Sequence, residues 1–200
     1  MSDDAGVRFW DGEADRFDDA VDHGLRDPVA RDRWRALLRT AIARPASRIA
    51  DLGCGTGTLS VLLAELGHRV HGVDFSPRMV ELARAKAVAA DVAVRPTFVV
   101  GNAADPPLVA GGFDVVLSRH VLWAMPDVGQ ALDRWLALLA RGGALVLVEG
   151  RWWTGGGLAA GDAVRFLSER GRAAVVSPLP DPALWGGPMS DERYLLISAR

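Results

Sequence analysis

A glycine-rich turn between a predicted buried strand and a predicted helix constrains the fold more than any other feature of this sequence. Residues 51–58 read Asp-Leu-Gly-Cys-Gly-Thr-Gly-Thr. Glycines permit a tight turn after the strand and let a ligand approach the backbone closely. The free N–H groups at the start of the helix then face that ligand. The segment therefore predicts an α/β fold with a ligand site at the carboxyl end of its first strand.

Predicted strands and helices alternate along the rest of the chain. The expected strands cover residues 48–52, 69–73, 97–100, 113–118 and 144–149, and the helices between them cover residues 58–66, 77–90 and 128–140. A glycine turn at 155–157 precedes a further helix to about residue 170, and strands at 173–177 and 193–198 flank a final loop. Strands separated by helices form a parallel sheet, whereas strands joined by a loop pair antiparallel. We therefore expect a Rossmann-like, doubly wound α/β sheet.

The first 45 residues differ from this alternation because they predict two helices and no strand. The first helix places apolar side chains on one face at helical spacing: Val7, Phe9, Trp10, Ala14 and Phe17. The second begins at Asp27-Pro28, an N-cap and a residue suited to the first turn, and carries Val29, Trp34, Leu37, Leu38 and Ile42. We predict a helical cover over residues 1–45 and a ligand-binding domain over residues 46–200.

The composition narrows the class of protein. The chain has 200 residues, a formal net charge of -2 and one cysteine, Cys54. This charge disfavours a nucleic-acid partner, and a single cysteine excludes an internal disulfide and disfavours a cysteine-based metal site. The acidic start, Met1-Ser2-Asp3-Asp4, is unlike a secretory signal, and no apolar run is long enough for a membrane span. We expect a cytoplasmic monomer or homodimer that acts on a small molecule, with no membrane and no metal.

Three polar side chains at predicted strand ends indicate what the glycine turn binds. Asp51 can face a cationic amine, and Asp74, at the end of the second strand, can accept hydrogen bonds from ribose hydroxyls. Asn102, after the third strand, offers its amide to an adenine edge. A dinucleotide fingerprint requires a third glycine where this chain has Thr58. An adenosine bearing an amino-acid group fits these residues better than a pyrophosphate does.

In this combination the sequence resembles the class I S-adenosylmethionine-dependent methyltransferases that act on small molecules. The resemblance rests on the segments 51–57, 73–74, 101–108, 113–116 and 141–146. It implies seven strands in the order 3-2-1-4-5-7-6, with strand 7 antiparallel, and S-adenosyl-L-methionine as the cofactor. The chain departs from the family at Asn102, where aspartate is common.

The resemblance also implies the residues that contact the cofactor. These are Asp51, Gly53, Cys54, Gly55, Gly57, Asp74, Phe75, Met79, Asn102, Ala103, Ala104 and Arg119. We interpret Cys54 as a small side chain in a tight loop and not as a nucleophile. The pattern of residues 9–25, together with residues 119–123, resembles bacterial methyltransferases of specialised metabolism. That likeness implies a small, planar or heteroaromatic acceptor, and it leaves nitrogen, oxygen and carbon open as the acceptor atom.

The acceptor is expected outside the carboxyl ends of the strands, where ligands bind in this class of fold. We predict that it contacts the aromatic and basic side chains Trp10, Phe17, Trp123, Arg151 and Trp152. Methyl transfer from a sulfonium requires proximity and alignment, and it requires a base only where the acceptor arrives protonated. His120 is the first candidate for that base and His23 the second, whereas His68 and His71 are interpreted as structural.

Other classes of function remain compatible with the sequence. One alternative is an NAD-type oxidoreductase, against which the missing third glycine argues. Another is a protein that binds S-adenosylmethionine without methylating, as a regulator or as an enzyme of cyclisation or rearrangement. A methyltransferase of nucleic acid or protein is disfavoured because the chain is short, slightly acidic and has no separate recognition domain.

Overall fold

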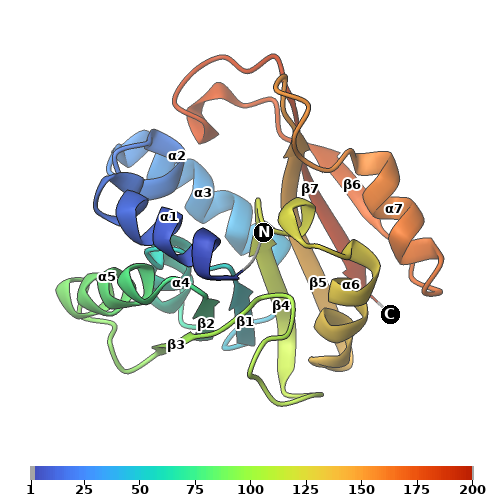
Figure 1. The fold of residues 1–200 in the computed structure, drawn as a ribbon, viewed down its shortest axis with the longest axis horizontal. Helices are drawn as coiled ribbons and strands as arrows, with labels where there is room; N and C mark the ends of the chain where they lie inside the picture. The colour runs from blue at the N-terminus through green and yellow to red at the C-terminus, as the bar shows by residue number, and fades with distance from the viewer. Residues whose placement is uncertain (1–2, 200) are drawn as a thin grey trace.

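A computed structural model describes residues 3–199 and shows one seven-stranded sheet (Figure 1). The strand order is β3-β2-β1-β4-β5-β7-β6, and β7 pairs antiparallel with both β5 and β6. This confirms the predicted fold class and strand order. The strands are β1 (Arg48–Leu52), β2 (Arg69–Asp74), β3 (Pro96–Val100), β4 (Phe113–Arg119), β5 (Leu139–Arg151), β6 (Val175–Pro178) and β7 (Glu192–Ala199).

Seven α-helices and two short 3-10 helices are present in the described part of the chain. They are α1 (Asp3–Phe17), α2 (Val21–Gly24), α3 (Pro28–Ala41), α4 (Thr58–Glu65), α5 (Pro77–Ala89), α6 (Val128–Ala137) and α7 (Ala160–Ser168), with η1 (Leu122–Ala124) and η2 (Pro182–Leu184). Three predicted N-caps are confirmed. The side chains of Asp27, Ser76 and Asp127 each accept a hydrogen bond from the backbone N–H three residues later. No helix within residues 3–199 is both long and apolar enough to cross a membrane.

The structure differs from the sequence-based expectation in several places. Strand β5 begins at Leu139, because the glycines expected to end a helix instead form an irregularity within the strand. Helix α7 ends at Ser168, and β6 begins at Val175. Phe9 and Val29 are exposed, so their expected contribution to a buried helix face is wrong. Met1 and Ser2 of the acidic start lie outside the described residues.

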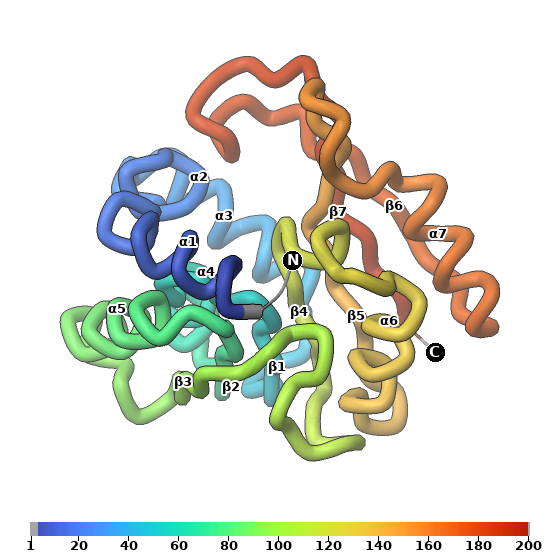
Figure 2. Tube along the Cα trace, in the orientation of Figure 1, coloured from blue at the N-terminus to red at the C-terminus, as the bar shows by residue number. Residues whose placement is uncertain are grey.

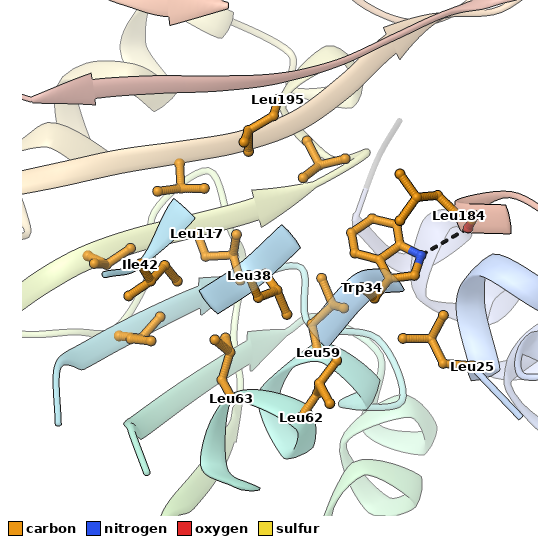
Figure 3. Packing of buried hydrophobic residues seen from close by; sticks show 14 of the residues in the cluster. Leu25, Trp34, Leu38, Ile42, Leu59, Leu62, Leu63, Leu117, Leu184 and Leu195 are labelled. Atoms are coloured by element: carbon orange, nitrogen blue, oxygen red, sulfur yellow. Dashed lines mark hydrogen bonds between the residues drawn. The ribbon is translucent and has the colours of Figure 1, made fainter. Parts of the chain in front are cut away.

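Two large apolar clusters cover the two faces of the sheet. Successive residues of β1 contribute to opposite clusters, as the alternation of side chains along a strand requires: Ile49 belongs to one and Ala50 to the other. The first cluster includes Trp34 and Leu38 of α3, packed against α4, β1 and β4 (Figure 3). The second is built around Trp135 of α6. Helix α3 therefore shares a core with the sheet, and the division at residue 45 stays a prediction.

Helices α1 and α2 lie over the carboxyl end of the first strands, beside α5 (Figures 1 and 2). Several polar contacts hold α1 against α5 and its N-cap. Asp11 accepts hydrogen bonds from the Ser76 hydroxyl and the Arg78 backbone N–H, and Asp15 forms an ion pair with Arg78. The cover therefore rests on the sheet domain through charge and hydrogen bonding at this edge.

Candidate functional site

A cavity of about 480 Å³ opens where the expected ligand site lies, between the cover helices and the carboxyl ends of β1 to β4. Its volume falls within the usual range for small-molecule sites, about 300–1,000 Å³. The described residues that line it include ten of the twelve predicted cofactor positions: Asp51, Gly53, Cys54, Gly55, Asp74, Phe75, Met79, Asn102, Ala103 and Arg119. Gly57 and Ala104 do not line it.

The glycine turn closes one side of the cavity with bare backbone. Gly55 has a φ of +54°, a conformation that favours glycine, and a Cβ built there would lie 3.2 Å from the Phe17 ring. The loop is held by Asp74, whose Oδ2 accepts a hydrogen bond from the Gly55 N–H at 2.8 Å. The backbone is therefore fixed in a form that leaves room for a ligand between the turn and the cover.

Two buried carboxylates face this space from β1 and β2. Asp51 accepts a hydrogen bond from the Ser60 hydroxyl at 2.6 Å, and burial raises the pKa of its carboxyl to about 6. Asp74 also accepts from the Ser76 N–H at 3.0 Å, and burial raises its pKa as well. Each carboxylate oxygen can accept a second hydrogen bond. Both side chains therefore keep the capacity to bind an ammonium or hydroxyl group.

Two further predicted positions have well-defined local environments. The side-chain oxygen of Asn102 accepts a hydrogen bond from the Ala104 N–H at 2.8 Å, so its amide N–H groups are left to donate to a base edge. Cys54 lies in the glycine turn, and burial raises the pKa of its thiol well above the usual value. A protonated thiol is a poor nucleophile. The raised pKa of the thiol therefore supports the interpretation of Cys54 as a packing residue and not as a nucleophile.

Arg119, at the end of β4, brings a positive charge into the cavity. Its guanidinium donates a hydrogen bond to the backbone oxygen of Asp22 and lies over the Trp34 ring, 5.1 Å from its centroid. Within residues 3–199, no carboxylate lies within ion-pair distance of this guanidinium. Burial lowers its pKa. Asp22, Asp51 and Asp18 act on this charge from a distance, and an anionic ligand group in the cavity could pair with it directly.

The two histidines proposed as bases lie together in the same cavity. His23 comes from α2, stacked on Phe17 with ring centroids 4.3 Å apart, and His120 follows β4 in a left-handed conformation with φ of 58°. Burial lowers the pKa of both imidazoles, and the nearby Arg119 lowers them further. Both rings are therefore uncharged at neutral pH, the form that can accept a proton.

Asp22 completes a cluster with these histidines, which the sequence did not predict. One ligand atom from each of Asp22, His23 and His120 lies within 4.8 Å of the others, close enough to hold a metal ion. Arg119 and Arg193 both act electrostatically on His120, and a divalent cation would be repelled by them. The charges around the cluster favour proton transfer over metal binding.

The predicted acceptor residues divide into two groups. Trp10, Phe17 and Trp123 line the cavity, whereas Arg151 and Trp152 do not. Trp152 instead packs edge-on against the His120 ring, with centroids 5.3 Å apart. Its place is behind the candidate base and not in the cavity wall.

Glu149, which the sequence analysis placed only within a predicted strand, is a further functional candidate. Its Oε1 accepts hydrogen bonds from the N–H groups of Val121 and Leu122, at 3.0 and 2.8 Å. Its Oε2 is buried without a hydrogen-bond partner, and burial raises the carboxyl pKa to about 8. The side chain fixes the loop that carries His120 and Trp123.

Comparison with known proteins finds a family that matches the central part of the chain. Residues 50–147 match a family described as "Methyltransferase domain". Demethylmenaquinone methyltransferase of Thermus thermophilus is 38% identical over 120 residues, covering 58% of this chain and 54% of that protein. This part of the chain is therefore similar to methyltransferase domains.

Solved structures extend this likeness to the fold of most of the chain. Magnesium protoporphyrin IX methyltransferase of Synechocystis PCC 6803, solved with bound S-adenosylmethionine, has a TM-score of 0.68 and 22% identity, over 86% of this chain and 80% of that one. The cyclase SpnF has a TM-score of 0.74 and 19% identity, over 84% and 81%. The chain spans about half the length of the curated relatives it matches.

The residues of the cavity fit S-adenosylmethionine group by group. Asp51 suits its ammonium, Arg119 its carboxylate, and Asp74 its ribose hydroxyls. The space beside Gly55, which a Cβ would narrow, leaves the backbone accessible to the amino-acid part. His23 and His120 line the same cavity.

Proposed function

We propose that the chain transfers a methyl group from S-adenosylmethionine to a small planar or heteroaromatic metabolite. The observation that carries the proposal is one cavity that holds both a cofactor-type set of charges and two uncharged histidines. When bound, S-adenosylmethionine supplies a methyl group activated by its sulfonium. The protein then has to bind the cofactor and the acceptor, align the methyl group with the acceptor atom, and exclude water from the cavity.

The chain's own residues divide these tasks. Asp51, Asp74 and Arg119 bind and orient the cofactor by charge and hydrogen bonds. The aromatic side chains Trp10, Phe17 and Trp123 form walls that suit a flat acceptor. These walls also keep water from the acceptor atom, which strengthens the electrostatic contacts inside the cavity.

His120 and His23 receive the proton that an acceptor hydroxyl or ring N–H must lose. Asp22 supports His23, because its carboxylate lies 3.8 Å from Nε2 and stabilises the imidazolium that forms. Burial and the neighbouring positive charges lower the pKa of His120, so its imidazole is uncharged and can accept the proton. The acceptor class is supported by relatives whose names refer to quinone and porphyrin methylation.

The direct test is formation of S-adenosylhomocysteine when the protein is incubated with S-adenosylmethionine and a panel of phenols, quinols and N-heteroaromatics. We expect product with at least one planar acceptor. His120→Ala should lower kcat by about 10²–10⁴-fold while leaving cofactor affinity nearly unchanged.

Other outcomes point to different functions. Tight cofactor binding with an altered acceptor but no S-adenosylhomocysteine would favour a non-methylating enzyme such as a cyclase. Reduction of a nicotinamide cofactor by any substrate would favour an oxidoreductase. Unchanged kcat in His120→Ala would remove His120 from proton transfer.

A further inference from the structure

The imidazole of His120 packs against side chains from the far end of the chain. Its ring stacks on Trp185, with centroids 5.8 Å apart and planes 19° apart. Trp152 contacts the same imidazole edge-on. Trp185 lies outside the residues that match the methyltransferase family, in the loop between β6 and β7. The loop between β6 and β7, to which no role has been assigned so far, therefore packs against the imidazole of the candidate base.

Arg193 fills the same aromatic enclosure. Its guanidinium lies 5.0 Å from the Trp152 ring centroid and 5.4 Å from that of Trp185. Its side chain is 8% exposed, and its ion-pair partner Asp191 is 6% exposed. The Nε and Nη1 atoms of Arg193 and the Nε2 atom of His120 are all buried without hydrogen-bond partners. Trp152 and Trp185 therefore each contact both the Arg193 guanidinium and the His120 imidazole.

Trp185 is itself held by several contacts. Its indole N–H donates to the Leu179 oxygen at 3.0 Å, and its ring meets Trp34 edge-on at 5.6 Å. The indole N–H of Trp34 donates to the Leu184 oxygen at 2.9 Å, which ties η2 to α3 (Figure 3). Because these contacts are directional, they fix the surface on which His120 rests.

The same segment reaches the helix that carries the second histidine. Gly186 has a φ of +80°, and a Cβ there would come within 2.7 Å of the Val21 Cβ. Val21 directly precedes Asp22 and His23 in α2. Close approach of these two segments depends on glycine, so the loop between β6 and β7 packs against His120 and against the residue that precedes Asp22.

We propose that Trp185 and Arg193 are positioning residues that hold the His120 imidazole in place and keep it uncharged, an inference that rests on the proposed function. The stack on Trp185 fixes the plane of the ring. The buried charge of Arg193 opposes a second positive charge beside it. Other charged or titratable groups also surround His120. Arg119 and His23 act on it electrostatically, and Asp22 lies in the same cluster. Glu149 accepts hydrogen bonds from the backbone N–H groups of the two residues that follow His120.

The role of Trp185 is tested by Trp185→Leu and Trp185→Phe. Leucine removes the stacking face, so kcat should fall about tenfold to a hundredfold while the dissociation constant for S-adenosylmethionine changes little. Phenylalanine keeps a stacking face and should restore most of kcat. Trp153→Leu is the matched control, because that side chain is 84% exposed. Full kcat in Trp185→Leu would overturn the positioning role.

The role of Arg193 is tested by Arg193→Gln against Arg193→Lys, with Arg165→Gln as a control for loss of one charge. The readout is the protonation of His120 followed by NMR of ¹⁵N-labelled imidazole in the cofactor-bound protein, which does not require an acceptor. Removing the charge should raise the pKa of His120, and the acidic limb of the kcat profile should move to higher pH. Lysine should keep the wild-type behaviour.

The two measurements separate this inference from the proposed function. If His120 in Arg193→Gln titrates like the wild type, the charge role of Arg193 is wrong even if methyl transfer is found. If His120 titrates at higher pH but no acceptor is methylated, the electrostatic role stands and the proposed reaction fails.

Discussion

Asp74 serves the fold and the ligand site with the same carboxylate. Its two oxygens hold the backbone N–H groups of Gly55 and Ser76, and both oxygens keep lone pairs toward the cavity. The glycine turn and the start of α5 are therefore positioned by the side chain that we assign to the ribose. A residue with this double role links the shape of the loop to cofactor binding.

Asp74→Ala should weaken binding of S-adenosylmethionine by about ten- to a thousandfold. The estimate corresponds to loss of two charge-assisted hydrogen bonds of roughly 1.5–3 kcal/mol each, partly offset by relaxation. Calorimetry measures the affinity, and urea unfolding shows how much of the loss comes from the loop. Asp105→Ala is the control, since the Asp105 side chain is 75% exposed. Wild-type affinity in Asp74→Ala would contradict the ribose assignment.

At the scale of elements, strand β5 controls the loop that follows β4. Glu149 of β5 binds the N–H groups of Val121 and Leu122, and the Trp123 indole N–H donates to the His120 oxygen at 2.9 Å. These hydrogen bonds hold a left-handed turn at His120, a conformation that costs free energy for a residue other than glycine. A side chain of β5 thereby helps to set the position of His120, which follows β4.

Glu149→Gln should remove one contribution to the pH dependence of the protein's free energy of unfolding. Because burial raises the folded-state pKa of Glu149 from 4.5 to about 8, the folded state holds its proton longer than the unfolded state. The contribution of this group to stability is then present at low pH and is lost as pH rises between these values. Glutamine keeps an oxygen that accepts both N–H groups, so the variant should gain stability relative to wild type at about pH 8.5 and differ little near about pH 4.5.

Urea unfolding at the two pH values measures the difference in the free energy of unfolding. Glu192→Gln provides the comparison, because Glu192 is an exposed neighbour at the start of β7. If Glu149→Gln shows the same pH dependence as wild type, the Glu149 carboxyl is ionised without cost in the folded protein, and its assigned environment is wrong.

At the scale of the whole molecule, three distant segments determine the charge of the acceptor region. Asp22 and His23 come from α2, Arg119 and His120 from the end of β4, and Arg193 from β7. Arg119 and Arg193 are positive, Asp22 is negative and the two histidines are uncharged, and the sulfonium of a bound cofactor would add another positive charge. A divalent cation in the same place would experience net repulsion.

Activity should therefore survive removal of metal ions with a chelator. Displacement at a sulfonium needs no Lewis acid, and the histidines of the cluster are required for the proton. Turnover measured before and after treatment with EDTA tests this expectation. Loss of activity that is restored by zinc or magnesium would instead assign Asp22, His23 and His120 as metal ligands.

The sequence by itself determined the fold, and it named many of the residues that line the cavity. The alternation of strands and helices, the N-caps at Asp27, Ser76 and Asp127, and the glycine turn at residues 51–58 all act over a few residues. Such local preferences can be recognised without knowing what the rest of the chain does. Asp51 and Asp74 follow from the same logic, because parallel strands bring their carboxyl ends to one edge of the sheet.

Only the tertiary structure decided the environment of the proposed base. The sequence could name His23 and His120 as candidates, but not their proximity, because α2 and the end of β4 meet through packing between distant segments. It likewise gave no reason to select Trp185, which stacks on His120, or Arg193, which lies over the Trp185 ring, because both contacts depend on how the β6–β7 loop folds. Burial and neighbouring charge set the pKa of an imidazole, and both are properties of the assembled fold.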